Sequence, residues 1–199
     1  FYDVSRGSIE INGVDIRKYN LESLRTQIGY VAQKAHMFKG SIRSNICFGK
    51  PEASKEEMVH AATVAQASDF ISTREHGYED EIAEDGTNIS GGQKQRLSIA
   101  RVILKKPSLY IYDDSFSALD FKTDATLRKA LKPEVKNAIF FVVAQRISTI
   151  MDSDMIIVLD EGQIIGMGTH AQLLKDCSVY QEIAHSQLTQ KELDDYERN

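Results

Sequence analysis

The chain has 199 residues, which is enough for one domain or for a domain with a subdomain. Its formal net charge of −5 argues against a nucleic-acid-binding protein, whose binding surface would be basic. No apolar run approaches the length of a membrane span. Because the chain starts without Met and in the middle of a pattern, we expect it to be a piece of a longer protein. Cys47 and Cys177 lack the spacing of a metal site and are expected to be reduced packing residues.

The first half of the chain is predicted to combine a hairpin, a buried strand and several helices. Asn12-Gly13, between two short alternating segments, is the strongest short signal for a β-hairpin. The apolar run at 28–33 predicts a buried strand with a polar end. Residues 41–76 are predicted to be mainly helical, and Ser54 can cap the middle helix of that stretch. A polar loop follows.

The second half alternates strands with helices. The expected elements, in order, are a long helix opened by Ser90 and closed by Pro107, a strand at 108–113, a helix at 123–132, a strand at 138–145, a short helix, a strand pair within 155–168, and helices at 169–176 and 178–187. The last residues, 188–199, are expected to be solvated.

Three apolar runs, at 28–32, 108–112 and 138–144, are continuous and do not alternate with polar residues. Such strands are covered on both faces, so we expect an α/β fold with a mostly parallel sheet flanked by helices. Ligands bind at the carboxyl ends of the strands in such sheets. The polar residues at these ends, which predict the site, are Gln33, Asp113, Asp114 and Gln145.

Asp113 and Asp114 follow an apolar strand. A fixed carboxylate at Asp113 suits Mg²⁺, which prefers hard oxygen ligands and keeps several waters. Asp114, beside it, could orient or deprotonate an attacking water. Two acids at a strand end can also be ordinary turn residues, and this pair alone does not decide between the two interpretations.

The stretch Ser90-Gly91-Gly92 opens the long helix. Serine is a good N-cap, and a helix N-terminus is a ready site for an anion. Each glycine in a first helical turn costs about 1 kcal/mol relative to alanine. An ordinary capped helix would avoid that cost, so the glycines favour close approach by another molecule.

These segments together resemble the motifs of ATP-binding-cassette (ABC) ATPases of the exporter type. In this sequence they are VAQ with Gln33 (the Q-loop), EIAEDGTN with Glu84 (the X-loop), ISGGQKQR (the signature), SLYIYDD (Walker B), SALD (the D-loop) and VVAQRIST (the switch segment). The resemblance covers nearly the whole chain. The ordered set is specific to the family, although no single member is.

The resemblance implies a P-loop NTPase-like fold. Its core would comprise residues 1–40 and 105–187, and the helical subdomain with the signature would comprise residues 41–104. It also implies that two such domains sandwich ATP, and that the domain lies at the cytoplasmic face of a membrane beneath a transmembrane domain.

The resemblance further implies roles for individual residues. Ser90, Gly91 and Gly92 would contact the γ-phosphate of the partner's nucleotide, helped by Gln93, with Asn88 close by. Asp113 and Gln33 would serve Mg²⁺, and Asp114 and Gln145 would take the catalytic and switch positions. The regions of Gln33 and Glu84 would lie near the transmembrane domain. The D-loop residues would be Ser117, Ala118, Leu119 and Asp120.

The chain departs from the family first in its phosphate-binding loop. The Walker A motif G-x-x-x-x-G-K-[ST] is absent, and the family would place it just before Phe1. We therefore expect the fragment to bind ATP poorly. We also expect a gap beside the strand at 138–144, where the Walker A strand would pair.

Two further departures concern the catalytic positions. Asp114 stands where the family has Glu, and its reach is shorter by one methylene, roughly 1.5 Å. A misplacement of about 1 Å can cost on the order of 100-fold in rate. Gln145 replaces the switch His; it can still hydrogen-bond a phosphate oxygen but cannot carry positive charge. The sequence therefore predicts slow hydrolysis at this chain's own site and an intact signature that completes the site of a non-identical partner.

Three other classes of protein carry related motifs or fit the departures. A chromosome-maintenance ATPase would insert a very long coiled coil between Gln33 and Ile89, where this chain has only a compact helical stretch. A translation-associated ABC protein would carry two cassettes, and the X-loop-like segment favours an exporter. A regulatory module that binds ATP without significant hydrolysis is compatible with Asp114 and Gln145 and stays open. Lys94 and Arg96 are explained adequately by a solvated helix face.

Overall fold

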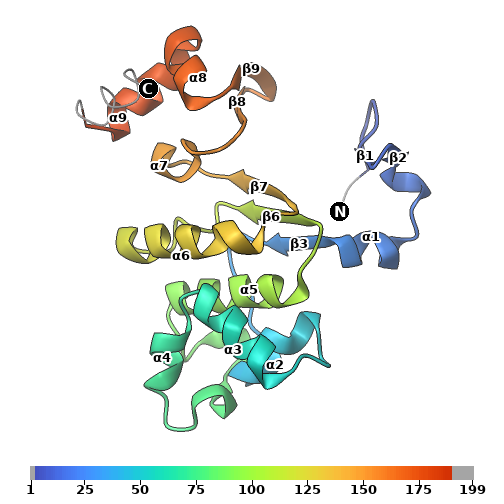
Figure 1. The fold of residues 1–199 in the computed structure, drawn as a ribbon, viewed down its shortest axis with the longest axis vertical. Helices are drawn as coiled ribbons and strands as arrows, with labels where there is room; N and C mark the ends of the chain where they lie inside the picture. Colours follow the sequence, from blue (N-terminus) through green and yellow to red (C-terminus); the bar gives the residue numbers. More distant parts are fainter. Residues whose placement is uncertain (1–2, 190–199) are drawn as a thin grey trace. The chain divides into compact units, whose positions relative to one another are not determined.

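The computed structural model describes residues 3–189. By its internal contacts the chain divides into two compact units, residues 1–141 and residues 142–199, and each is described by itself (Figure 1). The predicted tail at 188–199 falls mostly outside the described residues.

The central sheet of the structure has the strand order β3–β6–β7, with β3 at Ile28–Val31, β6 at Leu109–Asp113 and β7 at Ile139–Val143. Strands β3 and β6 are parallel, and Ile28 pairs with Leu109. The buried side chains on these two strands include Val31, Tyr110 and Tyr112. The predicted α/β fold with a parallel sheet is therefore confirmed.

One part of the strand prediction is wrong. Continuous hydrophobicity at 138–144 indicated burial on both faces, but Ile139 and Phe141 on β7 are 66% and 50% exposed. These alternate residues point to the same face of β7, so that face is left uncovered by the residues that the structure describes.

The N-terminal elements confirm the predicted hairpin. Asn12 and Gly13 both have positive φ (52° and 74°), as a two-residue hairpin turn requires. Asn20 caps the first helix by accepting from two backbone N–H groups. The elements are β1 (Glu10–Ile11), β2 (Val14–Asp15), the 3₁₀ turn η1 (Ile16–Lys18) and α1 (Leu21–Gln27).

The stretch after β3 is mainly helical, as predicted. Ser54 caps α3 through a reciprocal capping box with Glu57. The elements are β4 (Gly40–Ser41), α2 (Ile42–Ile46), η2 (Cys47–Gly49), α3 (Lys55–Val64), α4 (Ser68–Ser72), η3 (Gly77–Glu79), β5 (Glu81–Ile82) and η4 (Glu84–Gly86). The antiparallel β4–β5 pair was not predicted, because two residues per strand are too few to give a pattern.

The long helix α5 (Gly91–Lys105) organises the core of the first unit. Most of α5 is buried, with Leu97, Ile99 and Ile103 among its buried side chains, and the helix contacts α2, α3 and β3. Helix α5 packs against β3 (Figure 1). A Cβ added at Gly29 would lie 2.5 Å from Val102 Cγ1, so glycine permits this close approach. After β6, the helix α6 spans Phe121–Glu134.

The part of the second unit that the structure describes, residues 142–189, contains an antiparallel hairpin and three helices. These elements are α7 (Ile147–Ile150), β8 (Ile156–Asp160), β9 (Gln163–Gly168), α8 (His170–Asp176) and α9 (Ser178–Gln187). Its small core gathers Ile156, Leu173 and Tyr180 with neighbouring apolar side chains. His170 is buried there and its Nδ1 lies 2.7 Å from the Tyr180 hydroxyl.

Candidate nucleotide site

The carboxyl ends of β3 and β6 bring three of the predicted site residues together. The Gln33 side chain donates a hydrogen bond from Nε2 to Asp114 Oδ2 over 3.1 Å. Tyr30, three residues earlier on β3, donates from its hydroxyl to Asp113 Oδ2 over 2.9 Å. Tyr30 on β3 and Gln33 just after it thus reach the two adjacent acids at the end of β6.

Asp114 begins the turn that leaves the strand. Its φ of 44° lies in the left-handed region, which Asp tolerates better than most residues. Its carbonyl accepts a hydrogen bond from Ser117 Oγ over 2.7 Å. This tight turn lets two consecutive residues, Asp113 and Asp114, present carboxylates near the same strand ends.

Two further hydrogen bonds fix the backbone between Tyr30 and Gln33. The buried hydroxyl of Ser115 donates to the carbonyl of Val31 over 2.9 Å. The buried side chain of Gln95, on α5, donates to the carbonyl of Ala32 over 3.1 Å. The end of β3 is therefore tied both to the turn after β6 and to the signature helix.

The N-terminal tip of α5 is a second predicted element of the site. Ser90 Oγ accepts from the backbone N–H of Gln93 over 3.2 Å, and Gln93 Oε1 accepts from the backbone N–H of Ser90 over 3.0 Å. This reciprocal capping box fixes both side chains at the helix start. Gly91 has open space around it, since a Cβ added there would meet no atom within 4 Å.

The other glycine of the tip lies against the D-loop. A Cβ added at Gly92 would approach the backbone carbonyl oxygen of Ala118 to 3.4 Å. Leu119 is buried, and Asp120 caps α6 by accepting from the backbone N–H of Thr123. The hydrogen bonds from Thr123 lower the pKa of Asp120. The signature tip and the D-loop therefore form one continuous surface of the first unit.

Asn88 and Glu84 precede the tip of α5 in the sequence. Asn88 Oδ1 accepts from the backbone N–H of Ala83, and its Nδ2 donates to the carbonyl of Glu81 over 2.8 Å. The side chain of Asn88 thus braces the turn that leads into Ser90. Glu84, in η4, is exposed.

Gln145 belongs to the second unit and is exposed. Its backbone carbonyl accepts a hydrogen bond from Gln187 Nε2 over 2.9 Å. Asp114, the other predicted catalytic residue, belongs to the first unit.

The side chains at the ends of β3 and β6 have the chemistry of a magnesium site. They offer carboxylate oxygens on Asp113 and an amide oxygen on Gln33, which are hard donors. Within residues 3–189 no three His, Cys, Asp or Glu side chains form a metal-binding group. Mg²⁺ is commonly held by one or two carboxylates together with substrate phosphates, so this sparse donor set fits it.

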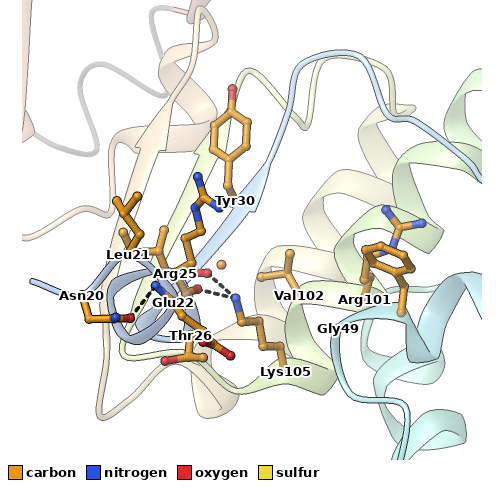
Figure 2. Close-up of a pocket in the computed structure, with 13 residues that line it drawn as sticks. Asn20, Leu21, Glu22, Arg25, Thr26, Tyr30, Gly49, Arg101, Val102 and Lys105 are labelled. Carbon is orange, nitrogen blue, oxygen red and sulfur yellow. Dashed lines mark hydrogen bonds between the residues drawn. The ribbon is translucent and has the colours of Figure 1, made fainter. Parts of the chain in front are cut away.

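A cavity of about 690 Å³ lies between α1, β3 and α5 (Figure 2). Lys105 lines this cavity and donates from Nζ to the carbonyls of Arg25 and Ile28, over 2.6 and 2.7 Å. These bonds satisfy carbonyls at the C-terminal end of α1. Partial burial lowers the pKa of Lys105. The lysine charge therefore serves to join α1 to α5.

Comparison with known proteins decides what this arrangement is. A family model described as ABC transporter matches residues 1–117, more than half of the chain. The chain belongs to the ABC transporter family. Within that family it is an ATP-binding domain with a P-loop NTPase-like fold, similar to the corresponding domains of exporters.

Individual ABC relatives are similar over almost the whole chain. A relative from Bacillus subtilis, YgaD, is named as a multidrug export ATP-binding/permease protein and is 46% identical over 183 residues, which cover 92% of this chain and 32% of YgaD. Heavy metal tolerance factor 1 of Caenorhabditis elegans is 40% identical over 190 residues, covering 96% of this chain and 24% of that protein. The chain thus spans about a third or less of the length of these relatives.

A solved structure gives the same result for the fold. The structure of a bacterial Atm1-family ABC exporter with ATP bound matches with a TM-score of 0.90 and 37% sequence identity, covering 93% of this chain and 33% of that one. None of the helices between residues 3 and 189 combines the length and the hydrophobicity of a transmembrane segment.

Three residues of the ABC domain were missed or misjudged from sequence. Arg96 does not lie on a solvated face: it donates to the carbonyl of Gln66 over 2.6 Å, and its guanidinium lies over the Phe70 ring. Partial burial lowers its pKa. Gln95 and Tyr30 were not predicted to contact the site, because bonds between distant segments leave no local signal in the sequence.

Proposed function

We propose that this chain is the ATP-binding domain of an ABC exporter and works by ATP-dependent dimerisation with a second such domain. The observation that carries the proposal is the tip of α5. A capped, glycine-containing helix start lies beside the D-loop, with Gly91 in open space. Such a tip can receive the γ-phosphate of a nucleotide held by a partner domain.

The chain's own site would use the acids after β6. Asp113 and Gln33 would hold Mg²⁺, and Mg²⁺ when bound would neutralise the charge of the ATP phosphates. Asp114 would orient the attacking water, and Gln145 would hydrogen-bond a phosphate oxygen. Because Asp114 is short and Gln145 is neutral, this site would turn ATP over slowly.

The assembly that follows from these departures is a heterodimer. The partner would carry Glu and His at the matching positions, and this chain would complete the partner's site with Ser90. The helical subdomain, residues 41–104, would carry the signature, and the core would comprise 1–40 and 105–187. The regions of Gln33 and Glu84 would lie against a transmembrane domain that holds this domain at the cytoplasmic face of the membrane.

Replacing Ser90 tests the proposal. In the intact transporter, Ser90→Ala should lower ATP turnover at the partner's site by about 100-fold, the typical cost of removing one donor to a transition-state oxygen. Ser54→Ala is the matched control, because it removes an equivalent capping box from α3 without touching a nucleotide. Both changes should cost about 1 kcal/mol of stability through the lost cap.

The alternative is a regulatory module that binds ATP without significant hydrolysis. Asp114 favours it, since its carboxylate is already engaged by Gln33. The same experiment separates the two: if the domain only regulates, Ser90→Ala and Ser54→Ala will leave the partner's rate equally unaffected.

A further inference from the structure

Tyr30 contacts Asp113 in a way that the nucleotide site described so far does not use. Its hydroxyl donates to Asp113 Oδ2 over 2.9 Å, between residues 83 positions apart in the sequence. Figure 2 shows the Tyr30 ring beside β3 with its hydroxyl pointing away from Lys105 and the cavity. The pairing register of β3 with β6 explains this contact. Tyr30 pairs with Ile111, and Asp113 follows Ile111 by two residues, so its side chain lies on the same face of β6.

This contact is not needed to hold β3 against β6. The strands are already paired from Ile28 to Val31. Hydrogen bonds from Ser115 and Gln95 fix the backbone beyond Tyr30. Tyr30 is itself 40% exposed, so its ring contributes less to the core than its buried neighbour Val31. Its hydroxyl acts on the side chain of Asp113.

Tyr30 is suited to act as a permanent donor. A tyrosine hydroxyl is a hydrogen-bond donor at neutral pH. Here it donates to the Asp113 carboxylate, which can only accept when ionised. A donor fixed to one carboxylate oxygen restricts rotation of the group and presents the other oxygen in a constant direction.

We propose that Tyr30 is a positioning residue that orients the Asp113 carboxylate toward Mg²⁺. This inference rests on the proposed function, in which Asp113 serves the metal. Side chains that hydrogen-bond a metal ligand typically change metal affinity by 10- to 100-fold when removed, roughly. Because Tyr30 is partly exposed to solvent, we expect a change in metal affinity at the lower end of that range.

Manganese binding provides the test, because it is measured without turnover. Mn²⁺ is titrated into the intact transporter with ATP present, and free Mn²⁺ is followed by electron paramagnetic resonance. Asp113→Asn identifies the class of Mn²⁺ sites that belongs to this chain. Tyr30→Phe, which removes only the hydroxyl, should weaken that class about tenfold. Tyr112→Phe is the matched control and should leave Mn²⁺ affinity unchanged, because it removes a phenol hydroxyl buried on the other face of β6.

The outcomes separate this inference from the function on which it rests. If Asp113→Asn abolishes the sites and Tyr30→Phe leaves their affinity unchanged, the positioning role is wrong and the metal role of Asp113 stands. If Asp113→Asn changes nothing, both are wrong. Urea denaturation of each variant is the second readout. A loss of Mn²⁺ affinity in Tyr30→Phe accompanied by an equal loss of folding stability would mean that Tyr30 only supports the fold, and would overturn the inference.

Discussion

Asp113 and Asp114 are adjacent acids held in different ways. Asp113 ends a regular strand and receives the Tyr30 hydroxyl. Asp114 has a left-handed backbone and receives the Gln33 amide. The left-handed conformation suits Asp, so the short side chain fits its backbone even though it suits the proposed catalytic role poorly.

Replacing Asp114 by the longer glutamate tests whether its short side chain limits catalysis. In the intact transporter, Asp114→Glu together with Gln145→His should raise ATP turnover at this chain's own site, because the carboxylate reaches roughly 1.5 Å further and the switch position can become charged. Single-turnover ATPase measurements would show the gain. An unchanged rate would contradict the explanation by side-chain length.

Tyr112 offers a stability prediction at the same strand end. It is fully buried, and its hydroxyl has no hydrogen-bond partner among the residues that the structure describes. Burial raises the pKa of this phenol far above its usual value. Tyr112→Phe should therefore raise the free energy of unfolding by about 1 kcal/mol, measured by urea denaturation. A fall of similar size in the free energy of unfolding would show that the Tyr112 hydroxyl has a hydrogen-bond partner.

At the scale of elements, the contact of β3 with α5 depends on a glycine. A Cβ added at Gly29 would lie 2.5 Å from Val102 Cγ1 and 2.6 Å from Pro107 Cγ. Gly29→Ala should therefore lower the free energy of unfolding by about 1–3 kcal/mol through overpacking. Gly91→Ala is the contrasting variant: space is open there and alanine favours the helix, so stability should not fall. Equal effects at both positions would contradict this reading of the contact.

Most elements were predictable because their signals are local. The Asn12-Gly13 hairpin, the Ser54 cap of α3 and the Ser90 start of α5 each lie within a few consecutive residues. The ties at the end of β3 were not predictable, because Gln95 and Ser115 reach Ala32 and Val31 from distant parts of the chain. The motif residues of the site were identified from sequence, but the side chains that hold them in place were not.

The exposure of one face of β7 was also not predictable from the sequence. The apolar run predicted two covered faces, yet Ile139 and Phe141 are exposed. A continuous apolar run indicates that a strand suits burial, but it does not indicate which of its two faces is covered.

At the scale of the whole molecule, we expect the isolated chain to bind nucleotide weakly. The 199 residues contain no G-x-x-x-x-G-K-[ST] loop, whose backbone and lysine hold the phosphates. Calorimetric titration with Mg²⁺ and ATP should give affinity weaker than the micromolar range. Micromolar binding would show that the residues present suffice without that loop.

In the intact, dimerised transporter, the tip of α5 is proposed to bind a nucleotide held by the other ATP-binding domain. A structure of the closed transporter with ATP bound would test this. We expect Ser90 Oγ at hydrogen-bonding distance, about 3 Å, from the γ-phosphate of the partner's nucleotide. A closed structure in which residues 90–93 lie far from every nucleotide would contradict it.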